Sequence, residues 1–149
     1  DGTGSSTKLA DKTVAQILRD IKELLQTVQK ATNNVEKATA LYLSPDAFAH
    51  LATTPLNDNS DTTILDFVSK THPQLRKIEE VGELASSDGK SDYMIAGVFE
   101  PEYVAFEIPE RYRQLPPQVR NLETVINCTS RAIGVTVTIP MAFVKAKGC

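Results

Sequence analysis

The apolar residues of this chain change their spacing about halfway along it, near Arg76. Before that point they recur three and four residues apart, which is the period that places side chains on one face of a helix. After it they occur in short runs rich in β-branched and aromatic residues, which is typical of strands. This division predicts an α+β fold in which helices flank an antiparallel or mixed sheet.

The most regular helical pattern predicts one long helix from about Asp11 to Asn33. Either Asp11 caps its start, or Thr13 does so together with Gln16 as a capping box. The stripe covers only about two heptads, which is too short to indicate a coiled coil. Its apolar positions are Val14, Ile17, Leu18, Ile21, Leu24, Leu25 and Val28.

Two shorter helices are expected to follow a buried strand at residues 40–43. The first begins after Ser44, a favourable cap followed by a proline, and ends before Pro55. The second carries Ile64, Leu65 and Val68, is capped by the last residues of the 57–61 loop, and ends at His72-Pro73.

The second half predicts short strands that meander antiparallel to one another, at residues 78–81, 93–99 and 104–108. Residues 108–118 contain three prolines and several charges, so we expect an extended surface connection there. Two further strands, Glu123–Arg131 and Val135–Phe143, are expected to form a long hairpin around Gly134.

No sequence motif for catalysis, nucleotide binding or metal binding occurs in the 149 residues. His50 and His72 are the only histidines, and neither has a carboxylate and a nucleophile at a spacing that would place them together. Cys128 and Cys149 have no metal-ligand partner in the sequence, and Cys128 is expected to be a buried thiol. We therefore expect no enzyme activity, no catalytic residue, no cofactor and no metal.

The balance of charges argues against nucleic acid and membranes as partners. Sixteen basic and nineteen acidic residues give a net charge of -3, and they are interspersed along the chain. No apolar stretch approaches the ~18 residues that a membrane-spanning helix needs. Sequence-specific nucleic-acid binding and membrane attachment are therefore not expected.

Two segments are candidates for contacts with a protein partner. The first combines arginine, tyrosine and leucine with stiffening prolines, which are features of interfaces. The second is an acidic edge, for which a solvated surface is the competing interpretation. The candidate interface residues are Arg111, Tyr112, Arg113, Leu115, Pro116 and Pro117 in the first segment, and Glu79 and Glu80 in the second.

A series of short motifs resembles the major capsid proteins of one group of tailed phages and prophages. It includes Thr63–Phe67 at a helix start, Ser91–Met94 at a strand start, Ile108-Pro109, Pro116–Gln118, and Gly134-Val135 through Pro140. The resemblance lies in their order, which extends over nearly the whole chain from about Val14.

The resemblance implies the Hong Kong phage type of capsid fold and its C-terminal part. Residues 1–10 would then be a flexible lead-in or truncation edge, residues 11–122 an axial-type domain, and residues 123–149 closing strands of the peripheral-type domain. It implies a subunit of a virion shell that forms pentamers and hexamers with copies of itself, has other virion proteins as further partners, and is made in the bacterial host cytoplasm. The alternatives are an encapsulin-like cellular shell protein and a small ligand-binding or regulatory domain.

Overall fold

The computed structural model describes residues 8–57, 60–85 and 92–148. The chain forms two compact units, one made of Asp1–Phe99 with Pro140–Cys149 and the other of Glu100–Ile139. Residues 1–7 of the expected lead-in lie outside the described residues, whereas Leu9 is buried in a short 3-10 helix. The assignment of ranges to axial and peripheral domains stays a prediction.

The first unit is built on a four-stranded mixed sheet with the strand order β10-β3-β1-β2. Strand β1 runs parallel to β2 and antiparallel to β3, and β3 runs antiparallel to β10. The expected meander was wrong, because β1 lies between β2 and β3 and takes the hydrogen bonds that a meander would give them. The strands are β1 (Ala40–Leu43), β2 (Lys77–Glu80), β3 (Tyr93–Gly97) and β10 (Phe143–Lys147).

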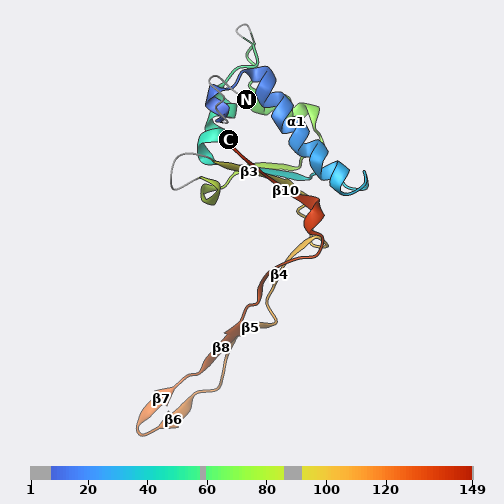
Figure 1. Ribbon diagram of the computed structural model, residues 1–149. Coiled ribbons are helices and arrows are strands. Elements are labelled where there is room, and N and C mark those ends of the chain that lie inside the picture. The colour runs from blue at the N-terminus through green and yellow to red at the C-terminus, as the bar shows by residue number, and fades with distance from the viewer. Residues whose placement is uncertain (1–7, 58–59, 86–91, 149) are drawn as a thin grey trace. The chain divides into compact units, whose positions relative to one another are not determined.

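Three α-helices accompany this sheet, and the longest, α1, packs against β3 and β10 (Figure 1). The apolar stripe predicted for α1 supplies the core, since Ile17 and Val28 have no exposed surface and Ile21 has 1%. The helices are α1 (Val14–Ala31), α2 (Pro45–Thr53) and α3 (Ile64–Thr71), with 3-10 turns η2 (Leu9–Asp11), η3 (Gly82–Leu84) and η4 (Pro140–Ala142).

The helix starts follow their capping residues. The predicted capping box is present in α1, where the Thr13 amide donates to Gln16 Oε1 at 2.9 Å. The Ser44 hydroxyl accepts from the Ala47 amide at 3.3 Å and starts α2, as predicted. Helix α3 is capped by Thr63 instead of by the 57–61 loop, because the Thr63 hydroxyl accepts from the Asp66 amide.

The second unit is a two-stranded antiparallel β-ribbon made of three successive strand pairs, which we call the arm (residues 100–139; Figure 1). Strand β4 pairs with β9, β5 with β8, and β6 with β7, so the pairs are nested around one turn at Asn121 and Leu122. The strands are β4 (Val104–Glu107), β5 (Glu110–Gln114), β6 (Gln118–Arg120), β7 (Glu123–Val125), β8 (Cys128–Arg131) and β9 (Gly134–Val137).

The arm corrects two expectations from the sequence. A hairpin is present, but its turn is at Asn121-Leu122, and Gly134 starts β9 without forming a turn between paired strands. The expected surface connection at 108–118 contains β5, because the prolines lie outside the strand, where no ladder hydrogen bond requires an N–H. Phe143 belongs to β10, in the other unit.

Candidate assembly surfaces

The first predicted interface segment lies on the exposed surface of the arm. Arg111, Tyr112 and Arg113 belong to β5 and are exposed, whereas Leu115 is half-buried and its amide donates to the Asn127 carbonyl at 2.9 Å. Pro116 and Pro117 are exposed between β5 and β6. The two prolines therefore lie outside the paired strands, and the role of all six residues in an interface stays a prediction.

Cys128 is exposed, so the expectation of a buried thiol was wrong. It starts β8 opposite Gln114, and its Sγ accepts a hydrogen bond from the Tyr112 hydroxyl at 3.1 Å. Donation to sulfur holds the proton on the phenol and, with a small effect of desolvation, raises the pKa of Tyr112. The pair joins β5 to β8 across the ribbon.

The second predicted segment lies on β2, the strand at one edge of the sheet. Glu79 and Glu80 are both exposed, and Glu79 Oε1 lies 3.7 Å from Lys77 Nζ. Such exposed ion pairs add little stability. Charges on an edge strand also oppose unwanted strand addition, so this edge is well suited to polar contacts. The acidic edge and the β5 residues belong to different units.

Sequence reasoning missed a large apolar face on the arm. Phe106 lies opposite Val135, and Val104 lies opposite Val137, in the β4–β9 pair. Because side chains alternate across a strand, these four share one face of the ribbon. Phe106 is 60% exposed and Val135 is 63% exposed. Nearby exposed apolar residues are Ile108, Ile133 and Ile139.

The apolar alternation from Val135 onward was visible in the sequence, but it was interpreted as one strand continuing to Phe143. The structure breaks that strand at η4, and β9 pairs only with β4. Exposed apolar faces of this kind on folded chains are typical of contact sites.

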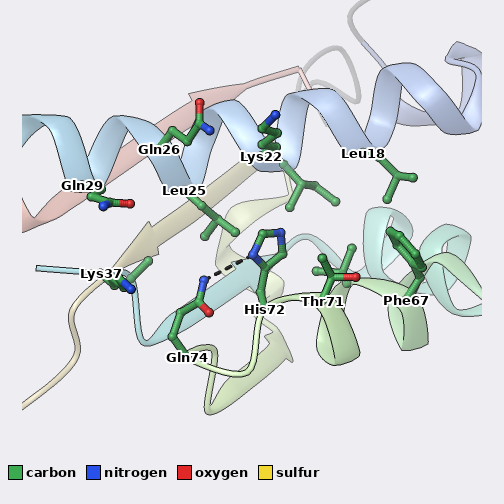
Figure 2. Close-up of a pocket in the computed structure, with 13 residues that line it drawn as sticks. Leu18, Lys22, Leu25, Gln26, Gln29, Lys37, Phe67, Thr71, His72 and Gln74 are labelled. Atoms are coloured by element: carbon green, nitrogen blue, oxygen red, sulfur yellow. Dashed lines mark hydrogen bonds between the residues drawn. The ribbon is translucent and has the colours of Figure 1, made fainter. Parts of the chain in front are cut away.

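A second feature that the sequence did not predict is a groove of about 490 Å³ between α1 and α3 (Figure 2). Leu18 and Leu25 from α1 and Phe67 from α3 point into it, and Val68 contributes to its buried wall. Polar side chains surround this apolar lining, namely the exposed Lys22, Gln26 and Lys37 and the half-buried Gln29 and Gln74.

One histidine lies in this groove. His72 Nδ1 lies 3.2 Å from Gln74 Nε2, which fixes the ring beside the groove (Figure 2). Neither Lys22 nor Lys37 forms an ion pair with another described residue. The groove therefore offers an apolar floor and a basic, uncompensated rim.

The described part of the chain contains no constellation that suggests chemistry. No three histidine, cysteine, aspartate or glutamate side chains among these residues lie close enough to hold a metal ion. No helix within the same residues has the length and apolar character needed to cross a membrane. The surfaces above are suited to contact and carry no arrangement for general acid or base catalysis.

Comparison with known proteins gives one family and a consistent fold. A family model described as major capsid protein matches residues 1–149. The structure is similar to the capsid of Myoviridae phage XM1, with a TM-score of 0.77 and 18% identity over 100% of this chain and 50% of that one. No curated protein matches in sequence.

A second solved structure, a virus-like particle from Pyrococcus furiosus, has a TM-score of 0.55 and 18% identity. This match covers 89% of the present chain and 51% of the other. The present chain thus spans about half the length of each solved chain that it matches. At this identity the similarity shows the fold, and it confirms the α+β capsid-type fold expected from the sequence.

Proposed function

Because this chain belongs to the major capsid protein family, we propose that it forms part of a phage capsid subunit that assembles with copies of itself. The assembled shell would be built by mutual burial of surface, with head-to-tail interfaces that close into rings of five and six. The family match does not favour a ligand-binding domain or a cellular shell as the function.

The observation that carries this proposal is the apolar face of the arm. A two-stranded ribbon is marginally stable in water, because it buries little surface by itself. The arm nevertheless exposes Phe106, Val135 and Val137 on one side. Burying such side chains contributes roughly 1.5–3 kcal/mol each, so association gives this ribbon the second layer that it lacks.

Further parts of the proposal follow from the family. The protein would act in the virion capsid after synthesis in the cytoplasm of a bacterial host, without catalysis and without reading a nucleic-acid sequence. The β5 residues Arg111–Arg113 and the acidic edge at Glu79 and Glu80 would contribute polar contacts between copies, and other virion proteins would join the finished shell. The axial and peripheral roles of the two parts of the chain are included in this proposal.

Association of the purified chain tests the proposal. We expect sedimentation velocity to show assemblies that grow with concentration, and electron microscopy to show rings or shells. The combination Phe106→Ser with Val135→Ser should reduce assembly strongly, because it places two hydroxyls on the apolar face.

The matched control is Ala105→Ser with Thr136→Ser, a facing pair on the opposite side of the same strands. This control should assemble as the unchanged chain does. A chain that stays monomeric at all concentrations would refute the proposal, and equal losses in the two double variants would show that the apolar face is not the contact.

A further inference from the structure

The tip of the arm carries an unusual side chain. Asn121 and Leu122 form the two-residue turn between β6 and β7, with φ of +46° and +69°. Glycine or asparagine is preferred at such positions, because a Cβ is strained there. Leu122 is nevertheless a leucine, and its side chain is fully exposed at 102%.

Both properties of Leu122 lower the stability of the isolated chain. The backbone is strained, and a large apolar side chain is kept in water. Strain of this kind is a reason to look for a function, since a turn selected for stability alone would carry glycine here. An apolar side chain that projects from a tight turn has the form of a knob that enters a pocket.

The groove between α1 and α3 has the complementary chemistry. Its floor is apolar, and its volume of about 490 Å³ exceeds that of one leucine side chain several-fold. Its basic rim residues, Lys22 and Lys37, suit the exposed carboxylate of Glu123, which directly follows the knob. The amides of Gln26 and Gln29 offer hydrogen bonds to the backbone of a turn.

We propose that the arm tip of one copy, Leu122 with Glu123, docks into the α1–α3 groove of a second copy. The inference rests on the proposed function, and it names one contact within that assembly. Knob and groove are different surfaces, so the contact is head-to-tail, the type that generates rings when the rotation closes. The partner is thus a second copy of this chain.

Disulfide trapping between two differently tagged copies tests this contact directly. Cys128 and Cys149 are first replaced by serine in both copies. One copy then carries Thr124→Cys, an exposed position two residues beyond Leu122 that leaves the knob and Glu123 in place, and the other carries Gln26→Cys, at the rim of the groove (Figure 2). The control pair combines Thr124→Cys with Asp46→Cys, an exposed position on α2 that does not line the groove.

Docking raises the effective concentration of two thiols to the millimolar range, so at micromolar protein we expect cross-linking about a hundredfold faster than in the control pair. Equal rates in the two pairs would overturn the inference, as would a dominant disulfide between two copies that both carry Thr124→Cys. Sedimentation of the same mixtures separates the two proposals. Association without the specific cross-link leaves the proposed function intact, whereas absence of association removes both.

A second variant tests the role of Leu122 as a knob separately from its role in the fold. Leu122→Gly relieves the turn, so the denaturant midpoint of the arm should rise, yet association should weaken about tenfold or more because the knob is lost. A higher denaturant midpoint together with weaker association supports docking. Unchanged association in this well-folded variant would overturn it.

Discussion

At the scale of single residues, Gly97 shows how closely β3 and β10 approach each other. It lies opposite Phe143 in the register of the two strands. A Cβ at this position would lie 2.9 Å from the Ala142 carbonyl oxygen and would also collide with the Phe143 ring. That ring stacks edge-on against Phe99 at 5.1 Å, so it has little freedom to move away.

Replacing Gly97 with alanine should therefore destabilise the first unit by about 1–3 kcal/mol, which is typical of overpacking. Gly82→Ala is the matched control, because no atom lies within 4 Å of the added carbon. This control should be neutral or stabilising by less than about 1 kcal/mol. Urea unfolding measures both, and equal stability of the two variants would contradict the close approach.

Ser44 provides a second prediction at this scale. It is fully buried, and its hydroxyl satisfies the Ala47 amide at the start of α2. Ser44→Ala leaves that amide without its partner and should lower the free energy of unfolding by about 1 kcal/mol. Ser69→Ala, an exposed change on α3, should stay within about 0.5 kcal/mol of the unchanged chain. A smaller loss for Ser44→Ala than for Ser69→Ala would show that the cap is unimportant.

Residue patterns in the sequence predicted some of these features and not others. The caps at Thr13 and Ser44 were predictable, because they depend on residues three positions apart. The exposure of Cys128 could not be predicted, because an apolar run is equally compatible with a buried core strand and with an exposed ribbon. The groove could not be predicted either, since it combines α1 with α3 through tertiary packing.

At the scale of elements, the three helices and the central strands lie near their predicted positions in the sequence. The pairing of the strands, however, differs from the prediction. Periodicity reports which face of a strand is apolar, and it does not report which strand lies beside it. Thus β1 separates β2 from β3, and the hairpin turn lies at Asn121-Leu122 instead of Gly134. The exposure of the apolar face shared by β4 and β9 could not be predicted, because the alternation in sequence is the same for a covered and for an exposed face.

The two units should differ in local stability. The β1–β3 pair lies within the sheet and carries buried residues such as Leu41 and Ala96. No side chain described in the arm is fully buried, so the arm opens without disturbing a core. Hydrogen exchange on the dilute chain should give amides of β4–β9 at least about tenfold less protection than those of β1 and β3. Equal protection would mean that the arm is covered in the monomer.

At the scale of the whole molecule, the arm begins and ends at neighbouring points of the first unit. The Val98 amide donates to the Ala142 carbonyl at 3.2 Å, so the chain leaves and returns at adjacent strands. Removal of residues 100–139, with a short Gly-Ser-Gly link from Phe99 to Pro140, should thus leave a unit that folds and unfolds in one cooperative transition.

The shortened chain should be monomeric, because both the apolar face and Leu122 are removed with the arm. Circular dichroism during urea unfolding reports the fold, and sedimentation reports the association. Loss of cooperative unfolding would show that the first unit depends on the arm, and assembly equal to that of the intact chain would show that the arm is dispensable for contacts between copies.

The pairing of β3 with β10 also has a consequence for synthesis on the ribosome. Residues 93–97 cannot pair with β10 until residues 143–147 have been synthesised, because the whole arm separates the two strands along the chain. During translation β3 therefore emerges with one edge open, and α1 lacks part of the surface that it later covers. Contacts this distant in sequence fold slowly. A nascent polypeptide therefore cannot complete its first unit until its arm has already emerged.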